Sequence, residues 1–243
     1  MEVGQVKKIL NIQEMGNSKW PGAIAQTFGD NLVSAFLFGD CLEEGFSALD
    51  NPWTVGIILK DASPDEVEKL SSLGPAALRE NLAFSHLWSG AEILNSLEEF
   101  PLEYLEISSR SVPLCGIAPL EGFAPKKDAL AKQCLREWKG FLFHKRACLA
   151  ECPSEKAKTQ AAGTALRELT PLLNGIFYAA FGKYPESRRQ VLEAFPQLGT
   201  PENPQPLTAM LRAVQELMDK TFAGSLTSAA ANSATSAAPA LTP

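Results

Sequence analysis

Residues 32–40 read LVSAFLFGD, and after a connecting segment residues 54–59 read TVGIIL. Each stretch contains a nearly continuous apolar run of strand length, the pattern that is typical of a buried strand. Gly39 follows the first run at once, and glycine at such a place favours a tight turn. The two runs therefore predict two buried strands, the first of which ends in a sharp turn.

The residues around these runs predict a sheet flanked by helices. Residues 5–31 look helical at their start and end, with a break at residues 20–22 (Trp-Pro-Gly). Residues 63–73 begin with a serine cap, a proline in the first turn and a glutamate three residues after the cap, which together mark a helix start. Residues 84–87 and 102–107 are predicted as further strands; in the latter, alternate residues share a face.

The second half of the chain is predicted to be helical. Residues 113–125 are loop-like and mark the expected domain boundary. Between residues 127 and 150 apolar residues recur at steps of three, four and seven, which builds one apolar helix face. Further helices are expected at residues 155–181, 186–195 and 207–222, completing a bundle of about four helices.

These patterns predict an α+β protein with three parts. The expected parts are a mixed sheet flanked by helices at residues 1–122, an all-α helical bundle at residues 125–222, and a tail at residues 223–243. The tail is rich in Ala, Ser and Thr and has no charged side chain. It offers little material for a core and is predicted to be disordered.

Charge is distributed unevenly along the chain. Residues 1–124 contain 7 Lys/Arg and 18 Asp/Glu, a net charge of −11, whereas residues 125–222 contain 15 and 10, a net charge of +5. The acidic first half disfavours nucleic acid as a partner. No apolar run approaches the roughly 20 residues of a membrane helix, and the first residues lack a signal-peptide pattern. We therefore predict a cytoplasmic protein without a membrane partner.

The sequence resembles the nucleotidyltransferase superfamily (polymerase beta-like fold). Residues 37–40 (LFGD) and 54–59 (TVGIIL) resemble the family pattern of a strand ending in Leu-Phe-Gly-Ser and a second strand beginning Asp-x-Asp. Residues 100–107 (FPLEYLEI) and 114–120 (LCGIAPL) look like the third-strand region of bacterial nucleotidyltransferase-like proteins. Residues 135–140 (LREWKG) resemble the start of the helical domain that follows in those proteins. The resemblance covers about residues 25–195.

The resemblance implies a site that this chain has lost in part. In the family, Gly-Ser holds the triphosphate and the Asp-x-Asp carboxylates bind magnesium, which neutralises charge at the attacked phosphate. Here Gly39 is kept, but Asp40 replaces the serine, and Thr54 and Gly56 occupy the two aspartate positions. Only Glu103 or Glu106 remains as a candidate for the third carboxylate. The resemblance thus implies a degenerate catalytic site with no metal and no cofactor.

Four other residue patterns have simple structural explanations. The acidic triplet at residues 66–68 lies in a predicted surface helix, and Cys41 has acidic neighbours that oppose thiolate formation. His86 lies in an apolar strand, where core packing explains it. Cys148 and Cys152 follow His144 at steps of four, a spacing that could hold a metal, although packing of small thiols explains it more simply.

Three functional hypotheses follow. The first is a catalytically degenerate nucleotidyltransferase-like protein that serves as a ligand-binding or protein-interaction module. Its ligand, a nucleotide or other small molecule, would lie in an interdomain cleft, with Gly39, Asp40 and the basic helix residues Lys132, Arg136 and Lys139 as binding residues. The second is an active magnesium-dependent enzyme that uses Asp40, Glu103 and Glu106. The third is self-association or partner binding through aromatic residues of the helical domain, namely Trp138, Phe141, Phe177 and Phe181.

Overall fold

The protein is a mixed α+β chain that divides into two compact units. The computed structural model describes residues 9–200, 203 and 205–233, with side chains as far as residue 223. The first unit comprises Met1–Leu97 and Glu103–Ala124, and the second comprises Glu98–Leu102 and Pro125–Pro243. The break after Ala124 falls within the stretch that the sequence marks as the domain boundary.

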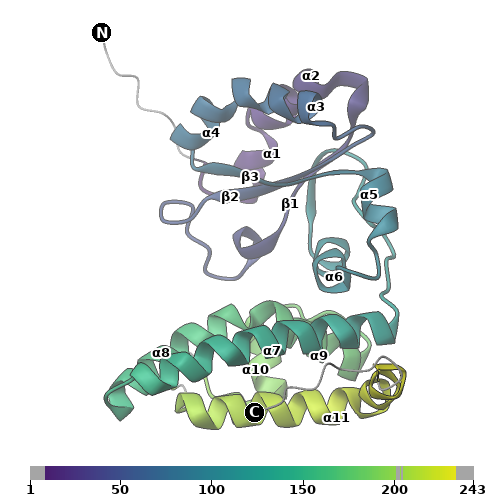
Figure 1. Cartoon of the computed structure of the whole chain (residues 1–243). Helices are drawn as coiled ribbons and strands as arrows, with labels where there is room; N and C mark the ends of the chain where they lie inside the picture. Colours follow the sequence, from purple (N-terminus) through teal and green to yellow (C-terminus); the bar gives the residue numbers. More distant parts are fainter. Residues whose placement is uncertain (1–8, 201–202, 204, 234–243) are drawn as a thin grey trace, which may run out of the picture. The chain divides into compact units, whose positions relative to one another are not determined.

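The first unit is built on a four-stranded mixed sheet with the order β3-β2-β1-β4. Strand β1 pairs antiparallel with both β2 and β4, and β2 pairs in parallel with β3. Figure 1 shows the strands with helices on both sides. The elements in chain order are α1 (Ile12–Gly16), α2 (Trp20–Phe28), η1 (Gly29–Asn31), β1 (Leu32–Leu37), η2 (Gly39–Leu42), β2 (Trp53–Leu59), α3 (Pro64–Glu68), η3 (Lys69–Ser72), α4 (Gly74–Arg79), β3 (Leu82–Ser89), α5 (Gly90–Asn95), α6 (Pro101–Ser109) and β4 (Val112–Gly116).

The central strands β1 and β2 are largely apolar because both faces of the sheet are covered. On one face, Leu37, Val55 and Ile57 pack in a core with Trp20 and Ile24 of α2. On the other face, the side chains of Phe36 and Ile58 pack with residues of α5 and α6. The predicted strands at residues 32–38 and 54–59 are confirmed, and the apolar runs have this simple physical cause.

Two sequence predictions about residues 102–116 are wrong. Residues 102–107 form helix α6 rather than a strand, and the predicted loop from residue 113 contains strand β4. In α6, the apolar residues at positions 102, 104, 105 and 107 are all buried. Because this short helix is buried on several sides, its apolar residues do not recur with a clear helical period. Strand β4 includes Pro113, which an edge strand tolerates because one row of its backbone groups is unpaired.

Two further boundaries differ from the predictions. Helix α2 begins at Trp20, so the sequence Trp-Pro-Gly starts a helix instead of interrupting one, and Pro21 lies in its first turn. The single helix predicted at residues 155–181 is two helices that meet at Leu169, with Pro171 near the start of the second. Proline is favoured there because the first turn of a helix needs no backbone N–H from it.

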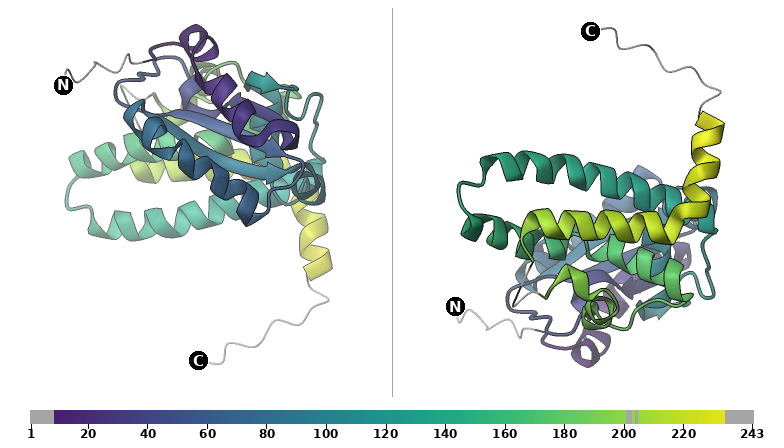
Figure 2. Two further views of the ribbon diagram at one scale, coloured as in Figure 1. Left: turned by 90° about the horizontal axis from the view of Figure 1, so that it is seen from above. Right: turned by 90° about the horizontal axis from the view of Figure 1, so that it is seen from below.

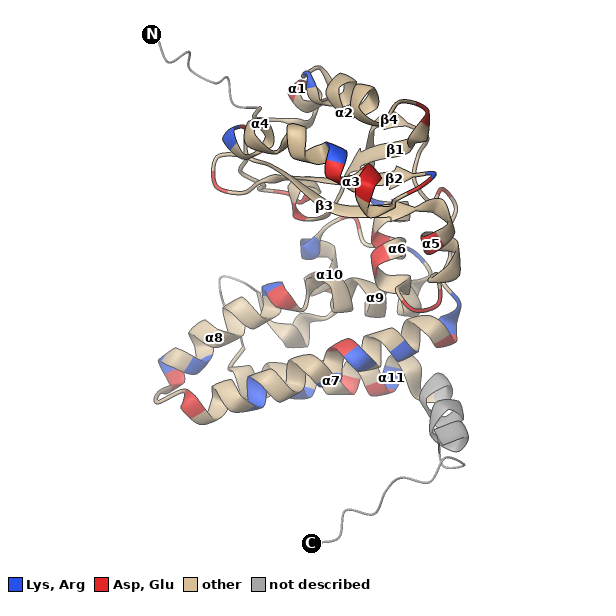
Figure 3. Cartoon of the chain, turned by 45° about the horizontal axis from the view of Figure 1, so that its top comes forward, with Lys and Arg blue, Asp and Glu red and all other residues tan. Residues whose placement is uncertain are grey.

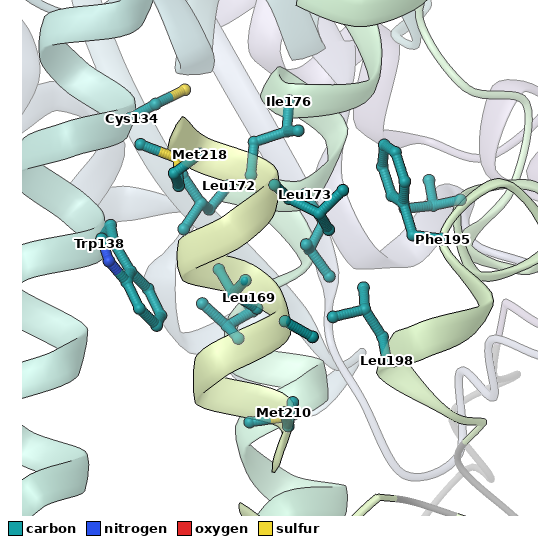
Figure 4. Close-up of a cluster of buried hydrophobic side chains, with 14 of the residues drawn as sticks. Cys134, Trp138, Leu169, Leu172, Leu173, Ile176, Phe195, Leu198, Met210 and Met218 are labelled. Atoms are coloured by element: carbon teal, nitrogen blue, oxygen red, sulfur yellow. The ribbon is translucent and has the colours of Figure 1, made fainter. Parts of the chain in front are cut away.

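The second unit consists of helices around one hydrophobic core. Helix α11 packs against α7, α8 and α9, and Figure 2 shows it running alongside α7. Figure 4 shows the core side chains that these helices contribute, including Trp138, Leu173, Ile176 and Met218. The elements are α7 (Lys127–Glu151), α8 (Glu155–Glu168), α9 (Thr170–Phe181), α10 (Arg188–Ala194), η4 (Pro196–Leu198) and α11 (Leu207–Ser233).

The end of the chain differs from the predicted disordered tail at residues 223–243. Helix α11 continues through a non-helical residue, Phe222, and ends at Ser233. Residues 234–243 lie outside the described residues. Across the described residues, no helix is both long enough and apolar enough to cross a membrane.

Candidate functional site

The chain makes the tight turn after β1 that the sequence predicts at Gly39. Gly39 opens the short helix η2 with a φ of 75°, a left-handed conformation that favours glycine. Asp40 is exposed to solvent and Cys41 is buried. Burial raises the pKa of the Cys41 thiol, and its Sγ donates to the carbonyl oxygen of Phe38 at 3.2 Å. The thiol is a packed core group, and its burial opposes thiolate formation in the same direction as its acidic sequence neighbours.

Strand β2 places Thr54 and Gly56 on the sheet face that packs against α5 and α6. Gly56 pairs directly with Phe36 of β1. A Cβ atom built on Gly56 would lie 2.5 Å from Cζ of Phe36 and 2.7 Å from its Cε2. The Phe36 ring therefore fills the space that a side chain at position 56 would need.

The same face carries a chain of aromatic rings, here called the aromatic layer. Successive ring centroids lie 4.7–6.2 Å apart, within the range of favourable aromatic pairs. The layer consists of Phe36, Phe38, His86, Trp88, Tyr104 and Phe123. The part of the sheet face where the family resemblance expects carboxylates and metal ions is thus aromatic and largely buried.

His86 is a member of this layer rather than an exposed base. Its ring lies 5.0 Å from that of Phe38 and 4.7 Å from that of Trp88. Burial lowers the pKa of His86, and the Glu103 carboxylate acts in the opposite direction. The neutral imidazole is favoured because the charged form would lose its hydration between two aromatic rings.

Helix α6 places Glu103 and Glu106 one turn apart, beside an arginine that sequence reasoning missed. Arg110 Nη2 lies 2.6 Å from Oε1 of Glu43 and 3.6 Å from Oε1 of Glu106. Asp40, Glu43 and Glu103 are all close enough to raise the pKa of Glu106 by repulsion. The other three carboxylates therefore lie around Glu106, and the Arg110 guanidinium pairs with Glu43 and Glu106. Glu106 and Arg110 have the i, i+4 spacing of a helical ion pair, the signal that could have revealed Arg110.

This acidic neighbourhood does not have the geometry of a metal centre. In the part of the chain that the structure describes, no three His, Cys, Asp or Glu side chains are grouped so that they could hold a metal ion. The Arg110 side chain supplies positive charge beside two of the carboxylates, which is the role a cation would otherwise have.

Glu106→Gln is expected to stabilise the protein at neutral pH. Burial raises the pKa of Glu106 above its ordinary value of 4.5, the nearby carboxylates add to this, and Arg110 opposes it. The folded state therefore holds this proton more tightly than the unfolded state. The stability that the protonated Glu106 side chain contributes is fully present below pH 4.5, and it is lost as the pH rises through the folded-state pKa of Glu106.

The measurement is thermal unfolding of wild type and variant. At pH 7 the uncharged glutamine should raise Tm by a few degrees, and this advantage should disappear at about pH 4, where glutamate is protonated. Glu43→Gln is the control, since it removes the closer partner of Arg110 and should not raise Tm. A Glu106→Gln variant with a lower Tm at pH 7 would contradict the expectation.

The predicted binding residues of the second unit lie on one exposed face of α7. Lys132, Arg136 and Lys139 line a shallow groove of about 500 Å³; Figure 3 shows the basic residues of α7 in blue. The apolar part of this groove, which sequence reasoning missed, includes Phe143, whose side chain is 64% exposed. We call this surface the basic groove, and its residues are Lys132, Leu135, Arg136, Lys139, Gly140 and Phe143.

Two cations of the basic groove, Lys132 and Arg136, have carboxylate or carbonyl groups beside them. Lys132 contributes to lowering the pKa of Glu98, whose main partner is Lys126. Arg136 donates through Nη2 to the carbonyl oxygen of Glu99 at 3.3 Å and through Nε to Oε1 of Glu137 at 3.4 Å. The groove thus combines cations with an exposed aromatic ring, a composition suited to an anionic ligand.

The four aromatic residues proposed for self-association differ in how deeply they are buried. Trp138 and Phe177 are buried in the core of the second unit. Phe141 is partly buried, and Phe181 is 53% exposed. Core packing therefore accounts for two of the four.

Comparisons with known proteins give no family assignment. No protein-family model matches the chain, and no curated protein shows significant sequence similarity to it.

Proposed function

We propose that this chain is a nucleotidyltransferase-like protein that has lost nucleotide transfer and acts as a ligand-binding or protein-interaction module. The observation that carries the proposal is the Phe36 ring, which occupies the space beside Gly56. Two-metal transfer needs anionic ligands that hold magnesium against the phosphates. Thr54 and Gly56 cannot provide such ligands, and charged groups in a buried aromatic layer would lose their hydration without compensation.

The basic groove is the proposed binding surface. The turn at Gly39 is a poor anion site, because Asp40, Glu43, Glu103 and Glu106 add negative charge around it. Like charges about 4 Å apart repel by on the order of 4 kcal/mol at an effective dielectric constant of about 20. Lys132, Arg136 and Lys139 lie instead on an exposed helix face beside Phe143. A ligand with phosphate or carboxylate groups next to an apolar part fits this surface.

Calorimetric titration of the full chain with ATP, GTP, CTP and UTP, each with and without magnesium, tests the proposal. We expect no magnesium-dependent binding and no nucleotide transfer. Any nucleotide that binds should do so equally well without magnesium, and the double variant Lys132→Glu/Arg136→Glu should weaken it at least tenfold, because two favourable contacts become repulsive. The matched control is Lys156→Glu/Lys183→Glu, which changes the net charge equally at exposed positions outside the groove.

A second candidate function, magnesium-dependent transfer by displaced carboxylates, is favoured by one observation: Asp40 and Glu103 both act electrostatically on Glu106. The same titrations separate the two functions. Magnesium-dependent binding together with transfer activity that Glu103→Gln abolishes would overturn the proposed loss of catalysis.

A further inference from the structure

The last turns of α7 bring two thiols together. Cys148 lies within α7, and Cys152 caps its C-terminal end. Their Sγ atoms are 4.0 Å apart, and both residues are half-buried. The backbone N–H of Cys152 donates to the carbonyl oxygen of Cys148 at 3.1 Å, so the helical spacing is kept as far as Cys152.

This geometry is compatible with a covalent bond between the two sulfur atoms. One helical i, i+4 step separates Cα atoms by about 6 Å, and disulfides span Cα separations of about 4.4–6.8 Å. The sulfur atoms must approach by about 2 Å to reach the S–S bond length of about 2.05 Å. Cys152 can contribute to this movement, because its φ of −76° and ψ of 110° already leave the helical conformation.

We propose that Cys148 and Cys152 form a redox-active dithiol that a hydroperoxide converts to an intramolecular disulfide. In the first step, one thiolate attacks the peroxide oxygen, which yields a sulfenic acid and releases water or the corresponding alcohol. In the second step, the other thiol displaces hydroxide from the sulfenic sulfur, which forms the S–S bond and releases water. The two thiols lose two hydrogen atoms in total, and the peroxide is reduced by two electrons.

The remaining cysteines are placed less favourably for this reaction. Cys41 and Cys134 are buried in the two hydrophobic cores, where a peroxide has poor access. Cys115 of β4 is half-buried, and desolvation raises the pKa of its thiol, as it also raises the pKa of the Cys152 thiol. The feature that distinguishes Cys148 and Cys152 is therefore the distance of 4.0 Å between their Sγ atoms. Cys115 is therefore the matched control: it is similarly accessible, but it lies in the other unit.

A metal site at the same place is less well supported. His144 lies four residues before Cys148, and the sequence alone left a His-Cys-Cys site open. Among the described residues no group of three metal-ligating side chains is present. The two sulfur atoms face each other, whereas a structural zinc site requires four ligands.

The disulfide would lock the end of α7 where the chain turns into α8. Cys152 is followed by Pro153 and by Ser154, whose hydroxyl accepts from the N–H of Ala157 and caps α8. Because the closed loop contains few residues, the effect on global stability should be small. The expected consequence is a local restraint on the α7–α8 turn that reduction reverses.

The test is oxidation of the reduced full chain with a small excess of hydrogen peroxide, followed by trypsin digestion and mass spectrometry. Cleavage after Arg146 and Lys156 yields one peptide, ACLAECPSEK (residues 147–156), that contains both thiols. We expect this peptide to lose the mass of two hydrogen atoms and dithiothreitol to restore it. The protein should retain three of its five thiols.

Two cysteine variants and a zinc titration distinguish an intramolecular disulfide from the other possible outcomes. Cys148→Ser should abolish the mass loss, Cys115→Ser should leave it unchanged, and circular dichroism should show both variants folded. Sulfinic acid on the unbridged peptide, or a disulfide between two chains, would overturn the proposal. Zinc that binds stoichiometrically and shields both thiols from peroxide would overturn it in favour of a metal site.

Discussion

Gly56→Asp is expected to lower the free energy of unfolding by about 3 kcal/mol or more, and to create no magnesium site. The new Cβ would lie 2.5 Å from Cζ of Phe36. Phe36 is fully buried, so its ring has little room to move. Overpacking of this kind costs about 1–3 kcal/mol, and a carboxylate in an apolar layer adds the cost of its lost hydration.

Urea unfolding of a small set of variants separates these two costs. Gly56→Ala should show the overpacking alone, about 1–3 kcal/mol. Adding Phe36→Leu to Gly56→Ala should recover part of the loss, since the variants share one contact and their effects should not add. Thr54→Asp should cost less than Gly56→Asp, because Thr54 is only partly buried. A stable Gly56→Asp protein that binds magnesium would refute the steric argument and the proposed loss of catalysis with it.

Trp138→Ala is expected to cost about 3–5 kcal/mol of stability in the second unit, the usual range for truncating a large buried aromatic side chain. The Trp138 side chain is 1% exposed and lies in the core, where it points from α7 toward α11 (Figure 4). Its Nε1 donates to Oε1 of Gln215 of α11 at 2.7 Å. The substitution thus removes packing and also one hydrogen bond between two helices.

Phe143→Ala is the control on the same helix. Its side chain is 64% exposed, and surface substitutions of this kind usually change stability by less than about 0.5 kcal/mol. Denaturant unfolding followed by helical circular dichroism gives both values. Equal effects of the two substitutions would mean that Trp138 does not hold α7 and α11 together.

Several elements were predictable from the sequence because local pattern and burial agree. The apolar runs of β1 and β2 are nearly continuous since both sheet faces are covered. Helix α7 has an apolar face with the correct period, and Trp138 and Cys134 lie on it as expected. Residues 102–107 were misread because burial on several sides of a short helix hides its period. Strand β4 was missed because Pro113 and Gly116 read as loop residues, although an edge strand accommodates both.

For the candidate site, the sequence predicted which residue types are present but not which side chains contact one another. Comparison with the family pattern predicted that the two aspartate positions, Thr54 and Gly56, lack carboxylates and that Asp40 replaces the serine. The ion pairs that Arg110 makes with Glu43 and Glu106 could not be predicted. Glu43 follows η2 and Arg110 follows α6, and only folding brings their side chains within 2.6 Å of each other. The exposed Phe143 in the basic groove was missed for a related reason, because exposure depends on what the other helices cover.

The sequence by itself determined that the chain has two buried strands followed by a helical region, and that it lacks an Asp-x-Asp pair at residues 54 and 56. These properties follow from residue type and short-range spacing. Only the tertiary structure decided that Phe36 fills the space beside Gly56, that six aromatic rings line that face of the sheet, and that Cys148 and Cys152 face each other. The physical reason is that ring packing and side-chain direction depend on strand register and on helix ends, which are set by contacts between distant residues.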